Sequence, residues 1–342
     1  MLADFFKKYR LLFLSLPFLY LAGNIHPLLA VVVLMFPLIR LIAAENREGL
    51  LMFFLMIVIF SDSRRVDFFF FKNLRLFVMI AMVMLSLIEL SRKRYQVRKL
   101  FFLVFTFFLI ALFALQRSPM PVTSFQKALS YFFLFFLVLH QWNFIAKTKG
   151  KEFFRDLIIL VTLVYLIGFI TLFLGLPSAR FNGRFRGLFG NPNGLGIHTT
   201  LMFGVIFFYF RAFPNIFSKT WRLLIWGALI ASILMCGSRN TLASVGLFSL
   251  FFFFFKGGIF RRLLFFLFFI PLAASVLNLE FIVSLVTRVG LGETLRIESI
   301  LTGTGRFHAW EYAMDLWKEY MWLGRGFHYD QTILDPDSIP IW

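Results

Sequence analysis

The sequence predicts an all-α, polytopic integral membrane protein. Of its 342 residues, 60% are hydrophobic and only 15% are charged, whereas soluble domains carry about 45–50% apolar and about 25% charged residues. Phenylalanine alone takes 52 positions. Long apolar stretches separated by short charged loops recur from the N-terminus to about Leu277. This composition excludes a soluble enzyme, a disordered protein and a nucleic-acid-binding module with an aqueous surface.

The apolar stretches predict about 11 transmembrane helices within residues 1–277. Several stretches are shorter than the roughly 20 residues of a straight membrane span, so tilted or re-entrant segments are open alternatives for them. The stretches are Leu11–Ala22, Leu28–Ala44, Leu50–Phe60, Leu74–Leu90, Leu100–Leu115, Phe125–Trp142, Leu157–Leu176, Gly194–Phe210, Leu223–Cys236, Thr241–Phe255 and Leu263–Leu277.

The distribution of basic residues predicts the orientation. If the N-terminus is cytoplasmic and each stretch crosses once, 20 of the 35 Lys and Arg residues lie inside, including the basic loops 92–99 and 147–155. That excess follows the positive-inside rule and places Ala3 inside and Pro340 outside. Much of the net charge of +18 is therefore an orientation signal, and we expect no nucleic acid partner.

Residues 278–342 form a more polar segment that lies outside by the same reasoning and holds 9 of the 17 acidic residues. Apolar residues repeat there at spacings of three and four, which predicts an amphipathic helix that ends near Gly324. The helix either lies on the membrane surface or covers a cavity. The repeating residues are Phe307, Trp310, Met314, Trp317 and Met321.

Three arginines occupy one outside loop, against the orientation rule: Arg180, Arg184 and Arg186. Asn191-Pro192 follows them, a pattern typical of a helix N-cap and first helical residue. The free N–H groups and the positive dipole end of that helix then face the same space as the guanidinium groups, which suits a diphosphate. The alternative is that the arginines bind anionic headgroups or pair with carboxylates of the C-terminal segment.

Two further arginines lie beside outside loops. Arg239, in Gly237-Ser-Arg-Asn240, follows an apolar stretch and either faces a polar cavity or reaches the outer headgroups. Arg306, at the start of the amphipathic helix, is either a further site arginine or a solvated loop residue.

The five histidines do not form a metal set. We expect His26, His140 and His198 to be packed and hydrogen-bonded, and regard His308 and His328 as the outside residues able to act as a base. A single cysteine excludes a disulfide framework and a cysteine-ligated metal. No nucleotide-binding loop, nucleophile elbow or zinc-protease motif occurs, so we expect neither a metal nor a cofactor.

Three segments together resemble the O-antigen ligase and polymerase superfamily of membrane glycosyltransferases. They are Arg186-Gly-Leu-Phe-Gly-Asn-Pro-Asn-Gly-Leu-Gly196, Cys236-Gly-Ser-Arg-Asn-Thr-Leu242, and Gly305-Arg-Phe-His-Ala-Trp310 continuing to Trp322-Leu-Gly-Arg-Gly-Phe327. The similarity covers roughly Arg180 to Phe327.

The resemblance implies a multi-pass protein of the bacterial inner membrane that moves a glycan from undecaprenyl diphosphate to a hydroxyl of a second glycan or of lipid A–core. It implies a catalytic role for Arg306. His308, two residues further along the same helix, is our candidate for the catalytic base because of its position, not because of the resemblance. The resemblance also implies a diphosphate site at Arg184, Arg186 and Arg239, with Asn191 and Asn193 at the helix start. The family's downstream His-Asn pair and final span are not found, so we expect a truncated member that transfers glycan poorly or not at all. The competing hypotheses are a transporter or flippase of lipid-linked oligosaccharides and a structural subunit of an envelope assembly.

Overall fold

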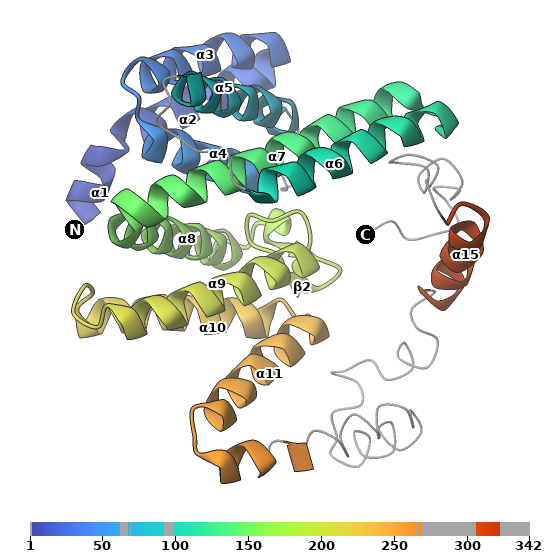
Figure 1. The fold of residues 1–342 in the computed structure, drawn as a ribbon. Coiled ribbons are helices and arrows are strands. Elements are labelled where there is room, and N and C mark those ends of the chain that lie inside the picture. Colours follow the sequence, from blue (N-terminus) through green and yellow to red (C-terminus); the bar gives the residue numbers. More distant parts are fainter. Residues whose placement is uncertain are drawn as a thin grey trace. The chain divides into compact units, whose positions relative to one another are not determined.

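The computed structural model describes residues 2–61, 68, 70–91, 99–264, 266–267 and 306–321, which are mostly helical (Figure 1). The chain divides into two units. One comprises Met1–Phe105 and Ser130–Leu242, and the other comprises Thr106–Leu129 and Ala243–Trp342. Strand structure within the described residues is confined to two two-residue strands. The predicted all-α class is therefore compatible with the structure.

Each of the first ten predicted apolar stretches overlaps a helix of the structure. The eleventh stretch, 263–277, lies mostly outside the described residues, as does the loop 92–98. The helices are α1 (Leu2–Lys8), α2 (Arg10–Ile25), α3 (Pro27–Ala43), α4 (Arg47–Ser61), α5 (Phe71–Ser91), α6 (Lys99–Ala114), α7 (Pro121–Thr148), α8 (Gly150–Phe173), α9 (Pro192–Ala212), α10 (Lys219–Met235), α11 (Arg239–Phe255) and α15 (Arg306–Glu319), with short 3-10 helices η2 (Leu115–Arg117) and η3 (Pro177–Ala179).

Two described helices, α8 and α9, are long and apolar enough to cross a membrane by length and composition. Five shorter apolar helices, of 10–17 residues, fall on other predicted stretches. Many large apolar side chains on α2, α3 and α6 are exposed, among them Phe18, Phe36 and Phe102. Such contiguous apolar surface is unusual for a soluble protein and fits contact with lipid.

The turn between α2 and α3 shows how local sequence sets the helix ends. His26 adopts an extended conformation, as a residue before proline usually does, and its side chain accepts a hydrogen bond from the Leu28 N–H. Pro27 is the first residue of α3. The two helices pack against each other, so the start of α2 lies beside the end of α3.

An ion-pair network joins α1, α4 and the start of α8. Asp156 is fully buried and accepts hydrogen bonds from Lys8 Nζ at 2.7 Å, from the Tyr9 hydroxyl at 3.1 Å and from the guanidinium of Arg155 at 2.8 and 2.9 Å. Lys8 also pairs with the buried Glu48 at 2.7 Å. Because buried carboxylates are costly unless paired, this network fixes the N-terminal segment against α4 and α8.

Candidate functional site: an arginine hairpin at the start of α9

The loop between α8 and α9 contains a small β-hairpin. Its strands are β1 (Arg180–Phe181) and β2 (Arg184–Phe185), which pair antiparallel with Phe181 opposite Arg184. Asn182 and Gly183 form the turn with φ values of 50° and 75°. Two positive φ values are typical of the tight hairpin turn that Asn-Gly favours. The sequence predicts the arginines of this loop as site residues but not the hairpin that presents them.

The hairpin is anchored to the C-terminal half of α8. The buried ring of Phe185 stacks on Phe169 with centroids 5.1 Å apart and an interplanar angle of 7°. The backbone of Gly187 passes so close to Gly168 that a Cβ on Gly168 would lie 3.1 Å from the Gly187 Cα. The Arg186 N–H also donates to the Ala179 carbonyl at 3.0 Å. The loop is therefore packed onto the helix.

Helix α9 begins where the sequence predicts. Asn191 is the N-cap residue, and its Oδ1 accepts a hydrogen bond from the Gly194 N–H at 2.7 Å. Pro192 follows at the start of the helix. The cap leaves other N–H groups of the first turn without a partner inside the helix, and these groups carry the positive end of the helix dipole.

Arg184 links the hairpin to two other segments. Its Nε donates to the Cys236 carbonyl at 2.9 Å, and its Nη2 donates to Asn193 Oδ1 at 3.2 Å. Cys236 follows the end of α10, 52 positions away in the sequence. One planar guanidinium thus holds together the hairpin, the first turn of α9 and the turn between α10 and α11.

The first turn of α9 also packs directly on the α10–α11 turn. A Cβ added to Gly196 would overlap Thr241 Oγ1 and would lie 3.1 Å from Ser238 Cβ. Only glycine allows this close approach. Arg239, the first residue of α11, lies between those two contact residues in the chain and is half-buried. The segments that carry the predicted residues Arg184, Asn191, Asn193 and Arg239 therefore meet.

Arg186 is oriented by backbone carbonyls. Its Nε donates to the Ser178 carbonyl at 2.9 Å, its Nη1 donates to the Gly190 carbonyl at 3.0 Å, and its guanidinium lies over the Phe181 ring. Burial lowers the pKa of Arg186 from its ordinary value, and within the described part of the chain it forms no ion pair. Two of its five N–H donors are used, which leaves donors for an anion.

The two sequence segments that carry Arg184, Arg186 and Arg239 contain no acidic residue. Neither the segment 177–196 nor the segment 236–241 includes an Asp or Glu. A cluster of guanidinium groups beside a helix N-terminus, with no acidic residue in either segment, is suited to bind a multiply charged anion such as a diphosphate.

His198 lies about two helical turns after the start of α9. Its Nδ1 is 2.9 Å from the hydroxyl of the buried Tyr165, and its ring centroid is 4.9 Å from that of Phe189. The expectation that His198 is packed and hydrogen-bonded is confirmed. Tyr165 was missed in the sequence, because a tyrosine within an apolar helix carries no signal of its partner 33 residues away.

Helix α15 confirms the predicted helix in the C-terminal segment. Its residues Trp310, Met314 and Trp317 are all exposed, as is Met321 just after it. The side chains of the predicted catalytic residues Arg306 and His308 lie outside the described part, as does His328. Their roles stay predictions.

Comparison with known proteins adds no relative: no protein-family model, no curated protein and no solved structure matches this chain.

Proposed function

We propose that this protein is a membrane glycosyltransferase that moves a glycan from undecaprenyl diphosphate to an acceptor hydroxyl during surface polysaccharide assembly. The observation that carries the proposal is the meeting of the arginine hairpin, the capped start of α9 and the Arg239 turn, in which Arg184 contacts a carbonyl 52 positions away. The three-segment sequence resemblance points to the same residues.

In this reaction the acceptor oxygen attacks the anomeric carbon of the lipid-linked sugar, and undecaprenyl diphosphate leaves. The chemistry needs cations that stabilise the negative charge growing on the leaving diphosphate. Arg186 and Arg239 take this role, while Arg184 holds the site together through Asn193 and Cys236. Arg306 assists these two arginines in stabilising that charge, and His308 takes the proton from the acceptor hydroxyl.

The proposed topology has about eleven spans in the bacterial inner membrane, a cytoplasmic N-terminus and the arginine hairpin outside. Two features of α8 support it. Lys8 binds Asp156 near the start of the helix, and the hairpin packs on Gly168 and Phe169 toward its end. At 1.5 Å per residue these contacts lie about 18 Å apart along the helix, so the N-terminal segment and the hairpin contact opposite ends of one candidate span.

The test is glycan transfer from purified lipid-linked donor by the protein in proteoliposomes. Arg239→Ala and Arg186→Lys should each lower the transfer rate by about 10-fold to 100-fold, the effect of losing one charge-assisted hydrogen bond of about 1.5–3 kcal/mol. Lysine fails at position 186 because it cannot span two carbonyls and a phosphate with one planar group.

The matched control is Arg180→Ala, which removes an exposed cation from the same hairpin and should leave the rate within about threefold. Equal activity of all three variants and the parent would refute the leaving-group role. Donor that crosses the membrane without being transferred would instead favour a flippase.

A further inference from the structure

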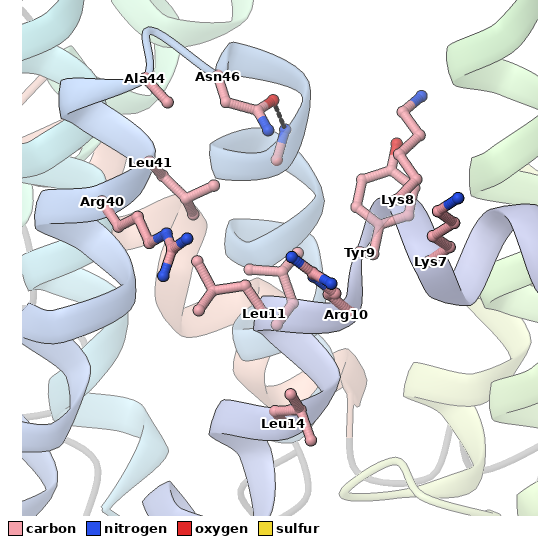
Figure 2. A pocket seen from close by; sticks show the side chains of 12 residues that line it. Lys7, Lys8, Tyr9, Arg10, Leu11, Leu14, Arg40, Leu41, Ala44 and Asn46 are labelled. Atoms are coloured by element: carbon pink, nitrogen blue, oxygen red, sulfur yellow. Dashed lines mark hydrogen bonds between the residues drawn. The ribbon is translucent and has the colours of Figure 1, made fainter.

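A cavity of about 370 Å³ opens among the N-terminal helices (Figure 2). Its walls come from α1, α2, α3 and the start of α4. The lining residues include four cations and several leucines, and no carboxylate is among them: Lys7, Lys8, Tyr9, Arg10, Leu11, Leu12, Leu14, Arg40, Leu41, Ala44, Asn46 and Gly49.

The cations that line this cavity differ in whether they are paired with a carboxylate. The Lys8 ammonium is taken by Glu48 and Asp156, each at 2.7 Å. Arg10 and Arg40, by contrast, form no hydrogen bond or ion pair through their side chains with any residue that the structure describes. Figure 2 shows their guanidinium groups on either side of the Leu11 side chain. Two arginines that share one opening without a protein anion favour an anionic ligand.

Apolar surface extends from the same opening. On α2, Leu14, Phe18, Leu21 and Ile25 follow one another at spacings of four and three, and are 63%, 63%, 59% and 76% exposed. A stripe of this spacing lies on one face of a helix and runs for about 16 Å. The neighbouring α3 exposes its own apolar residues, Val32, Phe36 and Ile39.

We propose that this cavity is a binding site for an anionic phospholipid, whose phosphate is bound by Arg10 and Arg40 and whose acyl chains lie along the exposed faces of α2 and α3. The combination of a basic pocket with an adjoining apolar stripe matches an amphiphile rather than a free anion. The lipid is not the glycan donor, because Lys8 reaches α8 near Asp156 whereas the hairpin packs on Gly168 and Phe169. Its placement in the inner leaflet rests on the proposed orientation; the binding itself does not.

The proposal is tested with the purified full chain in detergent, titrated with phosphatidylglycerol or phosphatidylcholine of matched acyl chains. Native mass spectrometry counts bound lipid, and thermal unfolding reports the stabilisation. The parent should bind at least one phosphatidylglycerol in preference to phosphatidylcholine. In R10Q/R40Q the affinity for phosphatidylglycerol should fall about 30-fold. R10K/R40K should retain most of it.

The matched control is R75Q/R262Q, which removes the same charge from two exposed positions elsewhere and should bind as the parent does. Leu14→Gln should weaken the binding of phosphatidylglycerol without changing the thermal stabilisation by inorganic phosphate. Equal binding of phosphatidylglycerol by R10Q/R40Q and its control would overturn the proposal. So would inorganic phosphate that stabilises the parent as strongly as the lipid, because the site would then be one for a free anion. Neither readout requires glycan transfer.

Discussion

At the scale of single residues, the site depends on arginines that are held by backbone carbonyls. Arg184 and Arg186 together donate to the carbonyls of Cys236, Ser178 and Gly190. Carbonyls orient a guanidinium without cancelling its charge, whereas a carboxylate would do both. In our proposal, these contacts hold the two guanidinium groups at the start of α9 for the diphosphate.

Two substitutions of the N-cap residue Asn191 distinguish its effect on folding from the effect of charge at the site. Asn191→Ala removes the hydrogen bond to the Gly194 N–H and should lower the free energy of unfolding by about 1 kcal/mol. Asn191→Asp keeps the cap and should retain the parent's thermal stability, but its negative charge faces the predicted diphosphate and should lower transfer at least tenfold. Thermal unfolding and the transfer rate measure the two effects. Full activity of Asn191→Asp would show that no anion binds there.

The arginines and the cap could be predicted from the sequence because each carries a local signal. Three arginines in seven residues violate an orientation rule, and Asn-Pro marks a helix start. The contacts of Arg184 with Cys236 and of Tyr165 with His198 could not be predicted. They join residues 52 and 33 positions apart, and no local pattern encodes which helices become neighbours.

At the scale of elements, glycines set how closely the segments of the site approach. Gly196 lies against Thr241 at a distance that excludes a side chain, whereas a Cβ added to Gly204, on the same helix, would have no neighbouring atom within 4 Å. Both residues belong to α9. Alanine substitutions at the two positions therefore compare a closely packed glycine with an unpacked one in the same helix.

Gly196→Ala should therefore separate the start of α9 from the α10–α11 turn and destabilise the protein by about 1–3 kcal/mol, with loss of transfer. Gly204→Ala should be neutral or slightly stabilising, because alanine favours helices. Thermal unfolding of both variants in the same detergent provides the measurement. Equal stability of the two variants would contradict the close packing of α9 on that turn.

Helix positions were largely predictable, since the ten apolar stretches within the described part all overlap helices. The exact ends of the helices were less predictable. Helix α7 extends from Pro121 to Thr148, beyond both ends of the predicted stretch Phe125–Trp142, because polar residues continue the helix where hydropathy alone shows a loop. The two-residue strands were missed for the opposite reason: they are too short for any periodic pattern.

At the scale of the whole molecule, the buried charged residues that the structure describes belong to one ion-pair network. The Asp156 network with Lys8, Tyr9 and Arg155 connects the N-terminal segment to α8. Asp156→Asn leaves the surrounding cations without their shared anion and should cost about 3 kcal/mol of stability. The control Glu152→Gln removes an exposed carboxylate one turn earlier and should change stability by less than about 0.5 kcal/mol. Thermal unfolding distinguishes them, and equal effects would show that the network is not stabilising.

The same network predicts an alkaline limit to stability. Burial alone would lower the pKa of Lys8, but the hydrogen bonds to Asp156 and Glu48 outweigh it and raise that pKa above its ordinary 10.5. Burial and the Asp156 charge raise the pKa of Tyr9 above 10.0. Because both protonated forms are favoured in the folded state, their stabilisation is complete below about pH 10 and is lost as the pH rises further. Lys8→Met should weaken this alkaline loss; an unchanged pH profile would contradict the assignment.

The arginine hairpin, the start of α9 and Arg239 together form, in our proposal, one diphosphate site. The most direct measurement is the binding of undecaprenyl diphosphate to the purified chain in detergent, compared between R186Q/R239Q and the equally charged control R75Q/R262Q. We expect a loss of affinity of at least about tenfold in the first variant and an affinity within about threefold of the parent in the second. Equal affinity in both variants would contradict the proposed site.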